Sequence, residues 1–195
     1  MEIFLICLLS YVIGSIPTAY IVGKLNNIDI RHHGSGNVGA TNVYRVLGNR
    51  WGIVTLIFDF LKGVIPTYIA TIYFTSPYLI MLAGLLAILG HIFTLFLSFK
   101  GGKGVATSTG VFMVITPYTL IIAMIVFLLV TRTSGFVSLG TLSATLIFMI
   151  SSLILNKSPE FKILIVIASI VIFITHIPNI KRLLKGEELR YNSNK

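Results

Sequence analysis

The chain has 195 residues, of which 55% are hydrophobic and only 11% are charged, whereas about 25% charged residues is usual for a soluble domain. Its mean hydropathy is +0.94, and its 15 Lys and Arg residues against 6 Asp and Glu give a formal net charge of +9. These values exclude a soluble enzyme and predict an all-α integral membrane protein with one domain, residues 1–195. The cations are scattered at the ends of apolar stretches, which argues against a nucleic-acid partner.

Five apolar stretches are each long enough to cross a membrane as a helix. They cover residues 3–23, 52–74, 78–98, 134–155 and 161–180. The first is not a signal peptide, because Glu2 stands where a basic region would precede the apolar run. A polar loop, residues 24–50, separates the first two stretches.

A sixth apolar stretch, residues 105–131, allows either one long kinked helix or two short helices that turn at Pro117. Two helices give seven spans and place 12 of the 15 cations on one side, whereas one helix divides them 8 to 6. Because Lys and Arg accumulate in cytoplasmic loops, we expect seven transmembrane helices with the N-terminus outside and the C-terminus cytoplasmic. The fourth and fifth must then be short, about 12 to 15 residues each.

The first polar cluster, which we call the first glycine-rich segment, covers residues 29–45. Its glycines allow positive φ angles and a close approach of the backbone to a ligand, and a series of such turns can direct several N–H groups at one anion. Arg45 could add a forked donor to a phosphate. The segment therefore indicates a phosphate site, although an ordinary loop between helices would share its composition. A dinucleotide fingerprint is rejected, because an apolar span rather than a strand precedes these glycines.

The second glycine-rich segment, residues 98–104, contains Lys100, Lys103 and three glycines directly before a predicted helix. Free N–H groups and the helix dipole favour an anion at such a position, and a basic cytoplasmic turn with glycine breakers is the alternative interpretation. It is not a Walker A loop, because Gly104 follows Lys103 where that motif needs Ser or Thr.

Other polar residues lie within or at the ends of apolar stretches. His176 and Asn179 would share a face if their helix continues past Pro178. Asp59 and Lys62 have the spacing of an ion pair on one helix, and His91 is at least as well explained as a core histidine as by catalysis. No cluster of His, Cys and carboxylates resembles a metal site, no cofactor is predicted, and no histidine is followed by Asp five residues later.

Together, three stretches resemble the bacterial acyl-phosphate:glycerol-3-phosphate acyltransferases of the PlsY type. They are the run from Gly14-Ser15-Ile16-Pro17 to Gly48, the run from Gly90-His91 to Lys100-Gly-Gly-Lys-Gly-Val-Ala-Thr107, and His176 to Arg182. The resemblance covers nearly the whole chain. It implies a multi-pass enzyme of the inner cell membrane, with its active site at the cytoplasmic face, which transfers an acyl group from acyl phosphate to the 1-hydroxyl of glycerol 3-phosphate.

The resemblance also implies roles for individual residues. The expected catalytic residues are Ser35, Asn37, Lys103, His176 and Asn179. The expected phosphate-binding residues are Gly36, Gly39, Thr41, Asn42, Arg45, Gly101, Gly102, Gly104 and Thr141. Thr141 stands where relatives often have Ser, and Thr94 stands where they have Pro. The expected partners are the two substrates, membrane lipids and, as a candidate, the soluble enzyme that makes acyl phosphate.

Two other classes of protein share these features. An anion or phosphate-ester transporter would use the same basic glycine loops, but its site usually lies near the membrane midplane between repeats, and no repeat is evident here. A non-catalytic lipid-binding membrane protein is the third interpretation. Activity with palmitoyl phosphate and glycerol 3-phosphate would separate the three.

Overall fold

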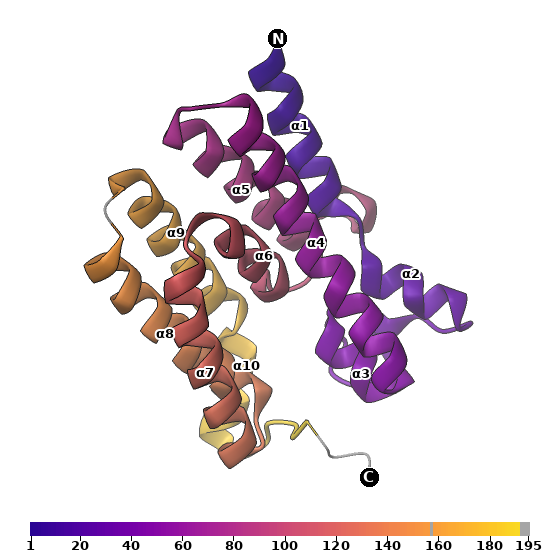
Figure 1. Cartoon of the computed structure of the whole chain (residues 1–195). Coiled ribbons are helices and arrows are strands. Elements are labelled where there is room, and N and C mark those ends of the chain that lie inside the picture. The colour runs from indigo at the N-terminus through magenta and orange to yellow at the C-terminus, as the bar shows by residue number, and fades with distance from the viewer. Residues whose placement is uncertain (157, 192–195) are drawn as a thin grey trace. The chain divides into compact units, whose positions relative to one another are not determined.

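The computed structural model describes residues 1–156 and 158–191, and every regular element within these ranges is helical. The chain divides into two compact units, unit 1 (Met1–Val114) and unit 2 (Ile115–Lys195). Figure 1 shows both units.

Unit 1 is built on three long helices that pack against one another: α1 (Glu2–Ser15), α4 (Asn49–Tyr73) and α5 (Pro77–Ile92). Small residues allow this close approach, as is common between membrane helices: Gly14 lies against the backbone of Ala87, and Gly90 lies against the backbone of Tyr11. The shorter helices α2 (Thr18–Leu25) and α3 (Ala40–Leu47) pack against α4 at its N-terminal end (Figure 1). Two 3₁₀ turns, Ile30–His32 and Leu95–Leu97, and helix α6 (Val105–Ile115) complete the unit.

Unit 2 begins with α7 (Pro117–Ser134), which packs along α8 (Val137–Leu155). Gly140 makes this contact possible, because a Cβ at that position would collide with the hydroxyl of Thr131. Helix α9 (Pro159–Thr175) packs on α8, and α10 (Ile177–Lys185) follows it at an angle of 51°.

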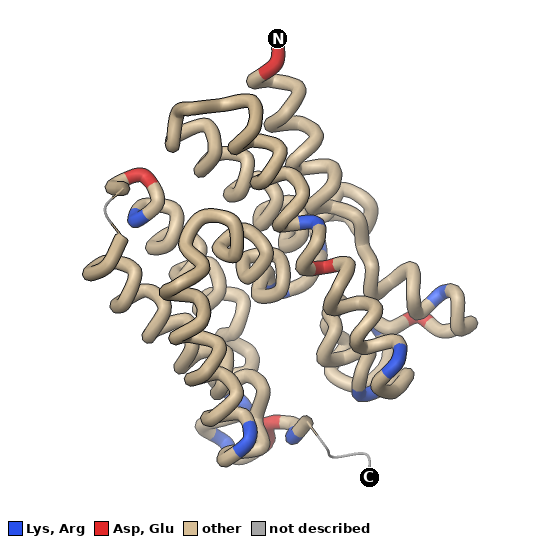
Figure 2. Tube along the Cα trace, in the orientation of Figure 1, with Lys and Arg blue, Asp and Glu red and all other residues tan. Residues whose placement is uncertain are grey.

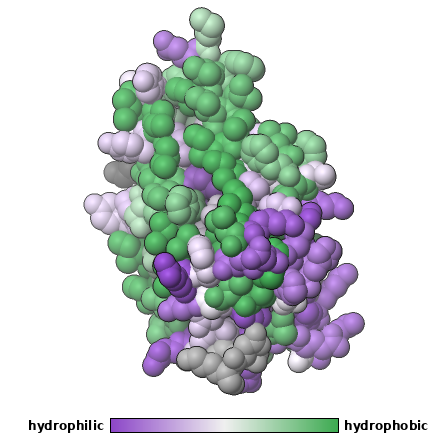
Figure 3. Space-filling model, turned by 90° about the vertical axis from the view of Figure 1, so that its right-hand side faces the viewer, coloured by the Kyte–Doolittle hydropathy of each residue, from purple (hydrophilic) through white to green (hydrophobic). Residues whose placement is uncertain are grey.

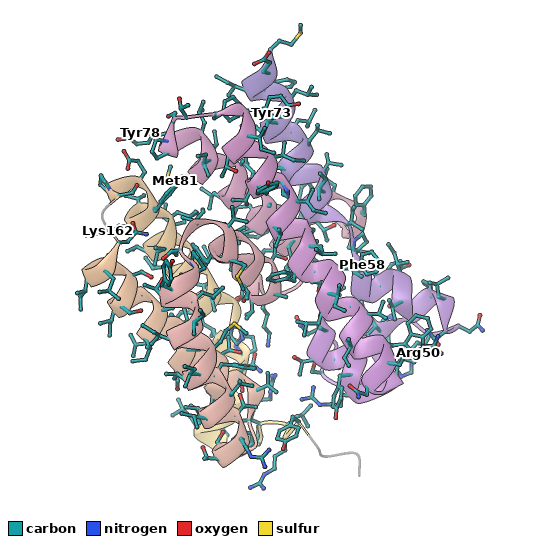
Figure 4. The ribbon with its side chains drawn as sticks, in the orientation of Figure 1. Arg50, Phe58, Tyr73, Tyr78, Met81 and Lys162 are labelled. Atoms are coloured by element: carbon teal, nitrogen blue, oxygen red, sulfur yellow. The ribbon has the colours of Figure 1, made fainter. Side chains whose placement is uncertain are left out.

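Several of the helices have the length and composition of membrane spans. Among the described residues, four helices are long and apolar enough to cross a bilayer, and up to six spans result if α1 with α2 and α9 with α10 each count as one bent span. Apolar side chains cover broad areas of the surface in Figure 3, as expected where lipid tails replace water. Figure 4 shows Arg50 at one end of α4, Tyr73 at its other end and Tyr78 nearby, with Phe58 projecting outward between them. Tyrosines at a helix end are typical of the membrane–water interface. Because several helices have the length and apolar composition of spans, the protein is a multi-pass membrane protein.

Charge in unit 1 is unevenly placed along the helices. In Figure 2 one red position lies at the N-terminus of α1 and one blue and one red position lie within α4, while several other charged positions lie toward the end with α2 and α3. The pair within α4 is Asp59 and Lys62, whose Nζ–Oδ1 distance of 2.8 Å confirms the predicted ion pair.

The structure corrects several predicted elements. The stretch 24–50 is not only a loop, because it contains α3, whose end is set by Gly48 at φ +83°. Residues 105–131 turn at Pro117 as the two-helix alternative predicted, but α6 has 11 residues and α7 has 18, so the expected lengths of about 12 to 15 residues each were wrong. The first span is bent by 40° at Pro17, which cannot donate a backbone hydrogen bond.

The last span is also divided, because α9 ends before His176 and α10 begins after it. The number of spans, their orientation and the single-domain assignment stay predictions. Lys157 and Lys195, which entered the charge count, lie outside the described residues.

Candidate active site

The first glycine-rich segment is a compact turn followed by a helix. Gly34 and Gly36 have φ angles of +60° and +71°, which only glycine adopts at little cost. The N–H of Gly36 donates to the carbonyl of His33, 3.0 Å away, and closes the turn. Ser35 and Asn37 are half-buried, and the Asn37 N–H lies 3.5 Å from the Ser35 hydroxyl oxygen.

The side chain of Asn42 holds this turn by three hydrogen bonds. Its side chain is buried, with 1% of its surface exposed. Its Oδ1 accepts from the N–H of Ser35 at 2.8 Å, and its Nδ2 donates to the carbonyls of Ile30 and His33 at 3.2 and 3.0 Å. A Cβ at Gly34 would collide with this Oδ1. The amide therefore shapes the segment with both of its polar atoms, whereas the sequence predicted a phosphate contact for it.

Helix α3 presents the other predicted residues of this segment. Gly39 precedes its first turn, in which the N–H groups of Asn42 and Val43 donate to the Gly39 carbonyl at 3.0 and 3.1 Å. This end of the helix carries the positive end of its dipole. Thr41 and Arg45 are one turn apart on the helix, so they lie on the same face, and both are half-buried. The arrangement offers backbone N–H groups, a hydroxyl and a guanidinium within two turns of helix.

The second glycine-rich segment is held against the end of α5. The N–H groups of Gly101 and Gly102 donate to the carbonyls of Ile92 and His91, at 2.8 and 3.1 Å. Ser98 and Phe99 have φ angles of +51° and +63°, and such a conformation is unusual for an aromatic residue and costs free energy. Lys103 follows, half-buried, directly before Gly104 and the N-terminus of α6.

The two segments meet within unit 1. A Cβ built on Gly102 would lie 2.8 Å from the carbonyl oxygen of Val38, so the two backbones are in contact there. A small pocket of about 10 Å³, close to the space one water needs, lies beside this contact. It is lined chiefly by polar residues, including Asp59, Lys62, His91 and Thr94, together with Val38, Gly101 and Gly102.

Unit 2 carries His176 and Asn179 at the junction between α9 and α10. His176 is buried, and its Nδ1 donates to the carbonyl of Ile172 at 2.8 Å. A neutral imidazole that donates from Nδ1 has its lone pair on Nε2. Asn179 Nδ2 donates to Oε1 of Glu188 at 2.6 Å. The break between α9 and α10 is thus bonded on the α9 side through His176 and beyond α10 through Asn179.

Glu188, which the sequence analysis did not single out, accepts hydrogen bonds from several residues around Asn179. Its carboxylate also accepts from Ser138 Oγ and from Arg182 Nε, each at 2.7 Å. Burial raises the pKa of Glu188, but the hydrogen bonds from Asn179, Ser138 and Arg182 outweigh it, so the net pKa lies below its ordinary value. The carboxylate is therefore ionised at neutral pH and stabilises this end of unit 2.

Thr141, also in unit 2, is buried and its hydroxyl donates to the carbonyl of Val137, one turn earlier, at 2.9 Å. A phosphate contact from this hydroxyl would require that bond to break. Within the described ranges of the chain, no group of three His, Cys, Asp or Glu residues could hold a metal ion, and the independence from metal stays a prediction.

Three other charged residues of unit 1, Lys24, Asp29 and Arg31, form ion pairs with one another. Asp29 accepts from Arg31 at 2.7 and 2.9 Å, which lowers the pKa of Asp29. Lys24 and Arg31 both lie over the ring of Tyr20. This group stabilises the start of the first glycine-rich segment.

The comparisons with known proteins agree on one family. Residues 4–186 match the family model described as glycerol-3-phosphate acyltransferase. The chain is 41% identical over 184 residues to the glycerol-3-phosphate acyltransferase of Trichlorobacter lovleyi, covering 94% of this chain and 95% of the relative.

Solved structures of the integral membrane glycerol 3-phosphate acyltransferase PlsY (YgiH) have the same fold. Its glycerol 3-phosphate form gives a TM-score of 0.94 at 35% identity, covering 97% of this chain and 96% of that one. Its lysophosphatidic acid form gives a TM-score of 0.91 at the same identity, covering 97% and 95%. The identity, the coverage and the matched family model together show that the chain belongs to the glycerol-3-phosphate acyltransferase family.

Proposed function

We propose that this acyltransferase takes its acyl group from acyl phosphate and transfers it to the 1-hydroxyl of glycerol 3-phosphate. Family membership makes the chain an enzyme that acylates glycerol 3-phosphate to lysophosphatidic acid. The donor is the part that we propose. The observation that carries it is the meeting of two glycine-rich segments, each leading into a helix N-terminus, at Gly102 and Val38. Two such segments suit two phosphate groups, one from each substrate.

The residues of unit 1 divide between the two segments. In the first, Ser35, Gly36 and Asn37 hold one phosphate together with Gly39 and Thr41 at the start of α3, and Arg45 neutralises its charge. In the second, Gly101, Gly102 and Gly104 bring the backbone close to the other phosphate, and Lys103 neutralises it. A forked guanidinium and a compact ammonium are the two side chains best suited to this task.

Asn42 contributes indirectly in this proposal. Its three hydrogen bonds keep Ser35 and Gly36 in place, so it orders the site without needing to touch the substrate. We propose that His176 and Asn179 orient the glycerol phosphate or stabilise the oxyanion, with Glu188 holding the amide of Asn179. Thr141 keeps its bond to Val137 and makes no essential substrate contact.

The chemistry follows from the donor. An acyl phosphate is a mixed anhydride. The 1-hydroxyl oxygen of glycerol 3-phosphate attacks its carbonyl carbon, and the bond between that carbon and the oxygen that bridges to phosphorus breaks. The products are 1-acyl-glycerol 3-phosphate and inorganic phosphate. The hydroxyl proton passes to a phosphate oxygen of a substrate, which we propose as the base. Fixed donors that stabilise developing charge typically contribute about 10²–10³ in rate each.

We propose that the active site faces the cytoplasm from the inner cell membrane. This placement follows from seven spans, with α6 as a short one, the N-terminus outside and 12 of the 15 cations inside. The site would then lie on the side where soluble glycerol 3-phosphate is available. The soluble enzyme that makes acyl phosphate is a candidate partner at the same face.

The donor is tested by measuring lysophosphatidic acid formed by purified protein from palmitoyl phosphate or palmitoyl-CoA at equal concentrations. We expect turnover with palmitoyl phosphate, one inorganic phosphate released per lipid, and little product from palmitoyl-CoA. Comparable rates with palmitoyl-CoA would overturn the proposed donor and leave the family assignment intact.

A further inference from the structure

The buried polar cluster of Asp59, Lys62 and His91 lies beneath the second glycine-rich segment and has no part in the chemistry above. All three side chains are more than nine-tenths buried. Lys62 Nζ lies 2.8 Å from Asp59 Oδ1 and donates to the carbonyl of Ile16, also at 2.8 Å. The pair therefore ties α4 to the break between α1 and α2.

His91 links this cluster to the glycine segment. Its carbonyl accepts the N–H of Gly102 at 3.1 Å, and a Cβ on Gly102 would collide with Nε2 of its ring. The backbone of Gly102 therefore rests on the imidazole. On its other side, the ring places Nδ1 at 3.8 Å from Asp59 Oδ1, and Nδ1 has no hydrogen-bond partner among the described residues. The ring is held by packing and by its charged neighbours.

A buried ion pair is weak evidence for stability, because the cost of removing two charges from water can exceed their attraction. Fixing a position is a better explanation for this cluster, since it touches the backbone one residue before Lys103. Thr94 supports the same place, because its hydroxyl donates to the carbonyl of Ser15 beside the pocket.

We propose that His91 is a positioning residue for acyl transfer. Its ring and carbonyl fix the position of the Gly102 backbone and thereby place the ammonium group of Lys103. This inference rests on the proposed role of Lys103. A displacement of about 1 Å in a catalytic group can cost about 10²-fold in rate. His91→Ala removes the support under Gly102, so kcat should fall about 10- to 100-fold, with the KM for glycerol 3-phosphate less affected.

The test compares purified His91→Ala with Ile80→Ala, a buried truncation at the other end of α5. Rates are measured at saturating palmitoyl phosphate over a series of glycerol 3-phosphate concentrations, beside thermal unfolding of each variant. The inference predicts a lower kcat for His91→Ala alone, with no greater loss in Tm than Ile80→Ala shows. Equal rates in the two variants would overturn it.

His91→Asn is the second variant, for the case that the alanine protein does not fold. It keeps a polar group beside Asp59 but removes the ring under Gly102, so the same fall in kcat is expected. A near wild-type rate in His91→Asn would show that the ring does not position the segment.

The link to Lys103 is tested by a double-mutant cycle at raised enzyme concentration. In a Lys103→Ala background, His91→Ala should slow the residual reaction by less than about threefold, because the group it places is gone. The full additional loss would refute positioning through Lys103. An active Lys103→Ala would refute the role of Lys103 and this inference together, whereas an impaired Lys103→Ala beside an unimpaired His91→Ala refutes the inference alone.

Discussion

Asn42→Ala probes whether the first glycine-rich segment works as an ordered turn. The substitution removes an acceptor from the Ser35 N–H and donors from the carbonyls of Ile30 and His33, all at a side chain only 1% exposed. Each such bond has a net value of about 0.5–1.5 kcal/mol, so the three together hold the turn by about 1.5–4.5 kcal/mol. A loss of this size leaves the ordered turn about 10- to 2,000-fold less favoured.

The assay is the initial rate of lysophosphatidic acid formation by purified protein over a series of glycerol 3-phosphate concentrations. We expect a large fall in kcat/KM, because the disordered turn must be ordered again each time substrate binds. Asn26→Ala is the matched control, since Asn26 makes one hydrogen bond to Val22, at 2.8 Å, outside the segment. Its expected cost is about 1 kcal/mol in stability with an unchanged rate. Equal behaviour of the two variants in both stability and rate would refute the reasoning.

Further predictions concern unit 2 and the orientation in the membrane. Glu188→Gln should lower Tm at neutral pH, and this difference should shrink as pH falls, because the wild-type carboxylate has a pKa below its ordinary value of 4.5. The stability it adds is present above that value and is lost as pH falls through the folded-state pKa; a difference that grows in acid would contradict this. Thr141→Val should keep kcat within about threefold, because the Thr141 hydroxyl is bonded to the carbonyl of Val137 and its loss costs only about 1 kcal/mol in stability. A loss of more than about tenfold in kcat would show that the hydroxyl does contact the substrate. A reporter fused to the C-terminus should be active in the cytoplasm, and a reporter active outside would refute the seven-span topology.

The sequence predicted most of the candidate site because its signals are local. Glycines, basic residues and helix-starting positions occur together in both glycine-rich segments, and the i, i+3 spacing of Asp59 and Lys62 was enough to predict their ion pair. Helix α3 was missed because it is short and its polar residues Thr41, Asn42 and Arg45 belong to the first glycine-rich segment, although Gly48 after Leu47 is a typical end signal.

Other features depend on distant contacts. Asn42 bonds carbonyls 9 and 12 residues earlier in the chain, and no short-range pattern predicts such pairs. Glu188 is one of two adjacent glutamates in a basic tail, and only the fold brings it to Ser138, 50 residues away. The break at His176 was signalled by Pro178, but the bend it produces was not.

The central claim, that the two glycine-rich segments grip substrate phosphates, is tested most directly by Arg45→Ala and Lys103→Ala, with Lys185→Ala as the control. Lys185 lies at the C-terminal end of α10 and has no role in the proposed site. Initial rates are measured at saturating palmitoyl phosphate over a series of glycerol 3-phosphate concentrations, after expression and Tm have been matched. Each removed charge-assisted bond is worth about 1.5–3 kcal/mol, so Arg45→Ala and Lys103→Ala should each lose about 10- to 150-fold or more in kcat/KM, and Lys185→Ala should lose little. Similar, small effects in all three variants would contradict the account.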